Sequence, residues 1–263
     1  MGRTFSALLI VAATSAYAAD QQPLVFDAES VGQPHSHARI ELWRPAGPGP
    51  FPVVVVLHGC GGVGAGSLSW AERLAGWGYV AAVVDSLGPR KLGDICAAGW
   101  LLSSEVRAQD AFNAAAYLRT LPEIDGDRVG VIGFSHGGSA TIAAALAEPG
   151  PADSAARQFQ AAVAFYPHCP TALPTHFSTD LLIVIGQDDE LNSADRCRYF
   201  VEENRDVRHT PTIKVYPGTG HAFDVPGLNT LSARGGRMRE NPEAARDSFE
   251  LTRRFLAEHL KGR

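Results

Sequence analysis

Five short, continuous apolar runs are separated by longer segments in which apolar residues recur at helical spacing. The runs are VVVVLHG (53–59), YVAAVVD (79–85), RVGVIGF (128–134), AAVAFYP (161–167) and LLIVIG (181–186). Strands of a parallel sheet have this texture, because helices bury both of their faces. The pattern therefore predicts parallel strands in an α/β fold.

The segments between these runs have the amphipathic spacing of helices. We expect helices around 68–77, 105–121, 136–148 and 193–204, and one at 242–260 that closes the chain after a last strand at 212–216. The segments 24–28 and 37–43 alternate apolar and polar residues, as half-exposed antiparallel strands do, and should begin the sheet at one edge. Together these elements predict a mainly parallel eight-stranded sheet flanked by helices.

The first eighteen residues have the layout of a secretory signal peptide. Arg3 supplies a positive charge, an apolar run follows from Leu8 to Ala13, and the segment ends on Ala16-Tyr17-Ala18, an A-x-A cleavage pattern. A membrane anchor is the alternative, but the apolar run is shorter than the ~20 residues that span a bilayer. We therefore expect residues 1–18 to be removed on export to the periplasm or the extracellular space. No later segment has the sequence of a membrane-spanning helix.

Composition favours one globular domain. The chain has 263 residues, of which 45% are hydrophobic, and a formal charge of −5. That length suits a single large core, so residues 19–263 are expected to form one domain. The mild acidity and the lack of a basic, aromatic-rich run argue against a nucleic-acid partner.

One serine stands where a strand turns into a helix. Ser135 lies between Gly133 and Gly137, after the 128–134 strand and before the 136–148 helix. This G-x-S-x-G arrangement is that of a nucleophile elbow, whose sharp turn brings strand and helix so close that only small neighbours fit. The alternative is a glycine-rich turn whose serine merely caps the helix.

A serine hydroxyl needs a base and an acid partner, and both follow in chain order. Asp188 and Asp189 come directly after the 181–186 strand, and His221 lies on a glycine-bounded loop after the last strand. Of nine histidines, His221 is the one that follows both the elbow and the aspartate loop and directly succeeds a strand. We predict Ser135, Asp189 and His221 as a catalytic triad and prefer Asp189 over Asp188.

Two backbone N–H groups are the candidate oxyanion donors. His136 follows the serine at the helix N-terminus, and Cys60 lies in the glycine-rich loop HGCGG (58–62) after the 53–59 strand. His58 could act as a base, but at this strand end we expect it to order the loop by hydrogen bonding. For His136 we assign only the backbone group.

Five motifs in order, LHGCGG, VDSLGPR, GFSHGG, IGQDD and GTGHAF, resemble the dienelactone hydrolase family of the α/β-hydrolase superfamily over most of residues 38–260. The resemblance implies an α/β-hydrolase fold and a carboxylic ester hydrolase that needs no metal or organic cofactor. The family's G-x-x-D stretch matches Gly186 and Asp189, which supports Asp189 as the acid.

The nucleophile departs from the family pattern. The enzymes that named the family use cysteine where this chain has Ser135, so their substrate does not transfer. Secreted members with serine look like general carboxylic ester hydrolases, and that is what the resemblance implies here. The triad itself predicts that an acyl-enzyme forms, and we expect the substrate to be a small or polymeric ester. Two alternatives stay open: a serine peptidase on the same fold, and a non-catalytic binding protein with a vestigial elbow.

The surroundings of the predicted site are less defined by sequence. The stretch between Pro167 and Asp180 is too short for a large cap, so an open site is expected. Arg90, Trp100 and His168, together with Leu87, are candidate lining residues, although Arg90 could instead bind a backbone carbonyl or Asp85. The stretch 225–241 could form a flap beside His221; the alternative is a mobile surface loop.

Four cysteines in an exported chain suggest disulfides. In the α/β-hydrolase strand order, the strands ending at Leu57 and Asp85 are neighbours, as are those ending at Tyr166 and Gly186. This order favours the pairs Cys60–Cys96 and Cys169–Cys197, with four buried free thiols as the alternative.

Overall fold

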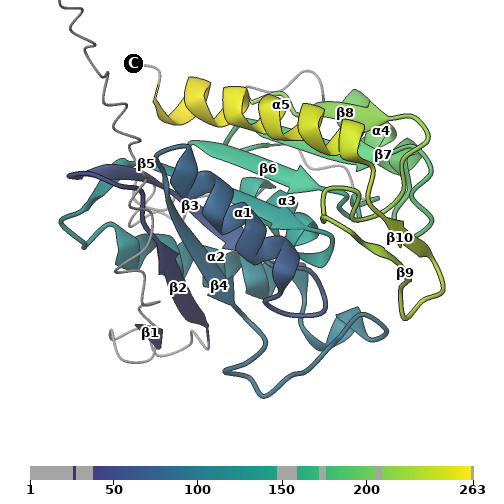
Figure 1. The fold of residues 1–263 in the computed structure, drawn as a ribbon, viewed down its shortest axis with the longest axis horizontal. Helices are drawn as coiled ribbons and strands as arrows, with labels where there is room; N and C mark the ends of the chain where they lie inside the picture. Colours follow the sequence, from purple (N-terminus) through teal and green to yellow (C-terminus); the bar gives the residue numbers. More distant parts are fainter. Residues whose placement is uncertain (1–25, 28–37, 147–158, 172–175, 205–208, 262–263) are drawn as a thin grey trace, which may run out of the picture.

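The described part of the chain forms an eight-stranded sheet between two layers of helices (Figure 1). The structure is a computed structural model, and it describes residues 26–27, 38–146, 159–171, 176–204 and 209–261. Its strands lie in the order β1-β2-β4-β3-β5-β6-β7-β8. They are β1 (Phe26–Asp27), β2 (Arg39–Trp43), β3 (Phe51–Leu57), β4 (Val80–Asp85), β5 (Ile124–Phe134), β6 (Ala161–Phe165), β7 (Leu181–Gly186) and β8 (Thr212–Tyr216).

Strands β3 to β8 run parallel, and β1 and β2 form an antiparallel edge. This is the arrangement that the apolar runs and the two alternating segments predict. The inner strands β3, β6 and β7 are buried almost throughout, which explains why their sequences lack polar alternation. Because all six parallel strands point the same way, the segments that follow them gather at one edge of the sheet.

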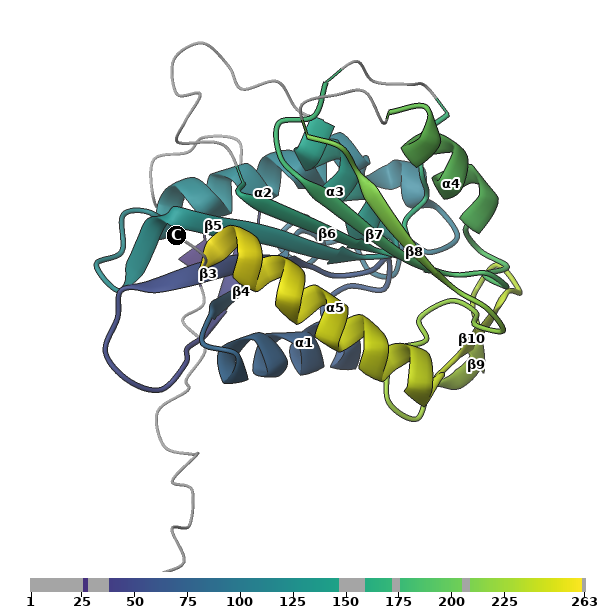
Figure 2. The same ribbon diagram turned by 90° about the horizontal axis from the view of Figure 1, so that it is seen from above.

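Helices cover both faces of the sheet. Figure 2 shows α1 and α5 on one face and α2, α3 and α4 on the other. Ser103, Ser193 and Asn241 precede α2, α4 and α5, and each side chain accepts a hydrogen bond from a backbone N–H in the first turn, which fixes where the helix begins. The helices are α1 (Ala65–Gly76), α2 (Ser104–Leu118), α3 (His136–Leu146), α4 (Ala194–Glu202), α5 (Pro242–Leu260) and a short 3-10 helix at Gly99–Leu101.

A small β-hairpin stands apart from the main sheet. Strands β9 (Asn229–Leu231) and β10 (Arg237–Arg239) pair with each other. Its residues are mostly exposed, so the stretch carries no apolar alternation from which strands could be predicted.

The predicted signal peptide, residues 1–18, lies outside the described residues. Among the residues that are described, no helix has both the length and the apolarity to cross a membrane.

Candidate active site

The elbow around Ser135 depends on its glycines. Ser135 has a φ of 53°, in the left-handed region. A Cβ atom on Gly133 would lie 2.1 Å from the carbonyl oxygen of Gly137, and one on Gly137 would lie 2.2 Å from that of Leu57. The close approach of β5, α3 and β3 therefore requires glycine at both positions, and it presents Ser135 at the carboxyl edge of the sheet.

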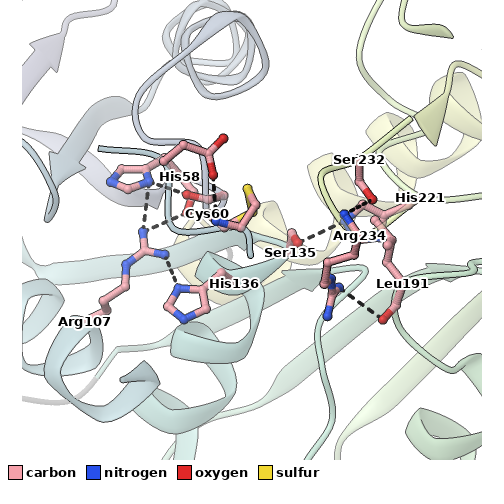
Figure 3. Close-up of a disulfide and its surroundings, with 12 residues drawn as sticks. His58, Cys60, Arg107, Ser135, His136, Leu191, His221, Ser232 and Arg234 are labelled. Carbon is pink, nitrogen blue, oxygen red and sulfur yellow. Dashed lines mark hydrogen bonds between the residues drawn. A yellow bond between two sulfur atoms is a disulfide. The ribbon is translucent and has the colours of Figure 1, made fainter. Parts of the chain in front are cut away.

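Ser135, His221 and Asp189 form one hydrogen-bonded chain. His221 Nε2 lies 3.0 Å from Ser135 Oγ, and His221 Nδ1 lies 2.7 Å from Asp189 Oδ2 (Figure 3 shows the serine and the histidine). The side chain of Asp189 is fully buried and that of His221 almost so. This geometry lets Asp189 hold the proton on Nδ1, which leaves Nε2 free to accept the serine proton.

The two candidate acids differ in their surroundings. The other oxygen of Asp189, Oδ1, accepts hydrogen bonds from the N–H groups of Leu191 and Asn192 at 2.8 and 2.9 Å. These bonds fix the carboxylate where it meets His221. Asp188 is exposed. Its N–H donates to the carbonyl of Thr219, so its backbone supports the histidine loop, the segment after β8 that carries His221.

The two predicted oxyanion donors both border the cavity that contains Ser135. His136 is the first residue of α3, so no carbonyl one turn earlier in that helix can accept its N–H. Cys60 follows Gly59, where an added Cβ would lie 3.9 Å from that of Ser135. The glycine-rich loop 58–62, called the oxyanion loop below after its predicted donor, is thus in contact with the elbow, as the predicted geometry requires.

His58 orders the oxyanion loop rather than reaching the serine. It is completely buried; its Nδ1 lies 2.6 Å from the Gly59 carbonyl oxygen, and its Nε2 accepts the N–H of Ser86 at 3.3 Å. Burial and the nearby cation of Arg107 lower the pKa of His58 to about 3, so the ring is neutral, with its proton on Nδ1. This arrangement agrees with the structural role expected for it.

Arg107 is a functional neighbour that the sequence reasoning missed. Its fully buried guanidinium donates to the carbonyl of His58 at 2.7 Å and to Nδ1 of His136 at 2.9 Å (Figure 3). It therefore joins the oxyanion loop to the elbow. A signal existed, because Arg107 falls on the buried stripe of α2 with Ala111 and Ala114, where a charge needs a specific partner.

His136 carries more than a backbone donor. Burial and Arg107 lower the pKa of its ring to about 4, and the ring also hydrogen-bonds the backbone of Gly99. Accepting from Arg107 places the proton on Nε2. The side chain thus links the elbow to the 3-10 helix at Gly99–Leu101, a role that the sequence left unassigned.

A buried carboxyl group packs behind the histidine. Asp224 Oδ2 accepts the indole N–H of Trp70 at 2.6 Å, and its side chain also hydrogen-bonds Tyr166. Burial raises the pKa of Asp224 above its ordinary range. The Tyr166 ring lies 4.6 Å from that of His221. Tyr166 thus links this buried cluster to the histidine, and sequence spacing gave no sign of it.

The disulfides are Cys60–Cys96 and Cys169–Cys197, the two pairs favoured by strand order. Their presence is consistent with an exported protein. The first disulfide ties the oxyanion loop to the segment that leads into the 3-10 helix, and the N–H of Ile95 also donates to the carbonyl of Cys60.

The candidate lining residues separate into two groups. Trp100, which is 80% exposed, and His168 both border the cavity. Arg90 does not border the cavity, which corrects the lining role considered for it. Both of its terminal nitrogens bind Asp110 at 2.8 Å, and one also donates to the Ser86 carbonyl. The buried Asp110 carboxylate explains why Arg90 points away from the cavity, because Asp110 without a cationic partner would carry a large desolvation cost.

The 225–241 stretch lies directly beside the histidine. Met238 forms a β-bridge with His221, and the N–H of Arg237 donates to Glu190 in the aspartate loop, the segment between β7 and α4 that carries Asp189. Arg234, at the hairpin tip, donates to the Leu191 carbonyl and borders the cavity (Figure 3). The stretch therefore lies beside His221, where the flap interpretation expects it, and contacts the loop that carries His221 and the loop that carries Asp189.

Among the described residues, no group of three or more histidine, cysteine, aspartate or glutamate side chains is placed to hold a metal ion. The chemical groups gathered at this edge are a hydroxyl, an imidazole, a carboxylate and backbone N–H donors. Such a set can carry out acyl transfer.

Comparison with known proteins gives a family match over residues 39–260, to the model of the dienelactone hydrolase family. A Bradyrhizobium protein named "Probable 2-oxo-3-(5-oxofuran-2-ylidene)propanoate lactonase" is 24% identical over 234 residues, covering 84% of this chain and 90% of its own. Mouse acyl-coenzyme A thioesterase 3 is 25% identical and is longer, so the match covers 86% of this chain and 62% of the thioesterase.

The fold also matches solved structures. The apo form of Thermogutta terrifontis esterase 2 superposes with a TM-score of 0.65 at 19% identity, over 92% of this chain and 97% of the esterase.

Proposed function

Because the chain belongs to the dienelactone hydrolase family and is a carboxylic ester hydrolase, we propose that it hydrolyses esters through an acyl-enzyme on Ser135. His221 is the proposed general base and acid, and Asp189 orients its imidazole. The N–H groups of Cys60 and His136 are the proposed oxyanion hole.

The proposed reaction has two halves. Ser135 Oγ attacks the ester carbonyl while His221 Nε2 takes its proton, and the oxyanion is held by the two N–H donors. The protonated His221 then gives that proton to the leaving alcohol. A water molecule, deprotonated by the same histidine, then attacks the acyl-enzyme. As the acyl–Oγ bond breaks, His221 returns that proton to Ser135 Oγ, and the acid is released.

The observation that carries the proposal is the unbroken contact from Asp189 through His221 to Ser135, at 2.7 and 3.0 Å. A serine that only capped a helix would not need a buried imidazole-carboxylate pair within reach. The same geometry favours a catalytic site over a vestigial elbow. Two of the relatives are named as a lactonase and a thioesterase, and both names denote acyl transfer to water, the reaction class proposed here.

We also propose that the chain is exported, with residues 1–18 as the signal peptide and residues 19–263 as one catalytic domain in the periplasm or outside the cell. The two disulfides support this location, because such bonds persist in oxidising compartments.

Substitution tests the proposal with a matched pair. Ser135→Ala should lower kcat for p-nitrophenyl acetate by roughly four orders of magnitude. Asp189→Asn should lower kcat strongly, because the amide no longer fixes the histidine tautomer, whereas Asp188→Asn, one residue away and exposed, should change it little. Wild-type rates in Ser135→Ala would contradict the mechanism, and a larger loss in Asp188→Asn would move the acid by one residue.

A further inference from the structure

A cavity of about 760 Å³ runs from Ser135 between α2 and α3, a volume within the usual range of ligand pockets. One stripe of each helix faces it, with residues spaced three and four apart. The α2 stripe consists of Ser104, Glu105, Ala108, Gln109 and Phe112, and the α3 stripe of Ser139, Ile142, Ala143 and Leu146.

The cavity is long. Leu146 lies eleven residues beyond Ser135 along α3, a distance of about 16 Å at 1.5 Å per residue. An extended chain of single bonds advances roughly 1.2 Å per bond, judged from the reach of an extended backbone. About thirteen single bonds would cover that distance, so a straight chain of about eight to twelve carbons attached at Ser135 fits within the cavity.

Polarity changes along the cavity. The polar part of its lining is near Ser135. Glu105 lies in the first turn of α2, His168 follows the end of β6, and Arg234 lies in the turn between β9 and β10. Farther along the helices the facing side chains are apolar: Phe112 on α2 and Ile142, Ala143 and Leu146 on α3. A polar or charged substituent would lose its hydration there without finding a partner, so the far part suits a hydrocarbon.

The position of His221 decides which half of the ester enters. Figure 3 shows Ser135 with His136 and Cys60 on one side and His221 on the other. The part of the cavity between α2 and α3 lies on the His136 side, while Arg234 borders the cavity near His221, which is not itself among the described lining residues. The leaving group must lie toward His221, which protonates it. The acyl group is then directed past His136, toward α2 and α3.

We propose that the space between α2 and α3 is an acyl-chain site and that the preferred substrates are esters of straight, saturated acids of about eight to twelve carbons. This inference rests on the proposed function, because it assumes that Ser135 carries the acyl group. Ala143 controls how far the acyl chain can enter, because its small side chain lines the cavity between Ser139 and Leu146.

The experiment compares p-nitrophenyl esters from acetyl to dodecanoyl, all below their aggregation concentrations, on the full mature protein. Wild-type kcat/KM should rise by up to about fourfold for each methylene that becomes buried. Ala143→Phe should lower the octanoyl-to-acetyl ratio of kcat/KM by at least about tenfold. Ala116→Phe, at a half-buried alanine of α2 that does not line the cavity, is the matched control and should leave the ratio unchanged.

Two further measurements keep the test decisive. If Ala143→Phe fails to fold, Leu146→Ala should instead move the preferred length upward, because it widens the far end. Ethyl and octyl acetate test whether the alcohol uses the cavity: sensitivity of octyl acetate to Ala143→Phe would overturn the assignment of the acyl chain. A wild-type preference for acetyl that still depends on Ser135 would overturn this inference alone, whereas hydrolysis that survives Ser135→Ala would overturn the proposed function.

Discussion

At the scale of residues, the buried cation of Arg107 lies between two neutral histidines, His58 and His136, and holds the parts of the site together. Arg107 donates to His136 and to the backbone of His58, and its positive charge helps to keep both rings unprotonated. A protonated His136 could no longer accept from Arg107, so the link between elbow and oxyanion loop holds only while the ring is neutral.

This network predicts a loss of stability in acid. The folded-state pKa of His136 is lowered to about 4 from an ordinary value of 6.5, so below pH 6.5 the unfolded chain takes up a proton that the native chain does not. The free energy of unfolding should therefore fall as the pH drops from 6.5 toward 4.

Urea unfolding at several pH values checks this prediction. In His136→Gln the slope over this window should be shallower by at most about 1.4 kcal/mol per pH unit. His176→Gln, at an exposed position, is the control. An unchanged slope in His136→Gln would show that this ring does not couple folding to pH.

At the scale of elements, the elbow is where three backbones meet. A Cβ on Gly137 would lie 2.2 Å from the Leu57 carbonyl oxygen, whereas one on Gly76, at the end of α1, would meet nothing within 4 Å. Gly137→Ala should therefore destabilise the protein by about 3 kcal/mol. Gly76→Ala should stabilise it by roughly 0.5–1 kcal/mol. Chemical denaturation measures both, and equal effects of the two substitutions would contradict the close packing.

The elements that sequence predicts well are those whose pattern follows from burial. The parallel strands are continuous apolar runs because helices cover both faces, and the order of serine, aspartate and histidine along the chain follows from the strand ends. The β9–β10 hairpin gave no such signal, because its residues are exposed and its position depends on contacts with Glu190 and His221. Arg107 and Asp224 likewise gain their roles only through partners distant in sequence.

At the scale of the whole molecule, two disulfides tie the loops at the carboxyl edge to the fold. They join residues 36 and 28 positions apart, so each should stabilise the protein by at most roughly 3.5–4 kcal/mol through loss of unfolded-chain entropy. Only the first, Cys60–Cys96, includes a proposed oxyanion donor.

The double variants Cys60→Ser/Cys96→Ser and Cys169→Ser/Cys197→Ser separate these roles. Both should unfold at lower temperature by a similar amount, while kcat should fall more in the first pair, whose oxyanion loop is released. Calorimetry and ester hydrolysis measure the two effects, and non-reducing peptide mapping of the wild type checks the pairing. Crossed pairs, or a larger loss of kcat in the second variant, would contradict this account.

The central claim is that Ser135 carries the acyl group, and covalent labelling tests it most directly. The mature protein is treated with an alkyl fluorophosphonate, residual ester hydrolysis is followed, and the modified peptide is identified by mass spectrometry. The account predicts one label per chain on Ser135, in proportion to the activity lost, and no label in His221→Ala over the same time. Loss of activity with Ser135 unmodified, or full activity with Ser135 fully labelled, would contradict it.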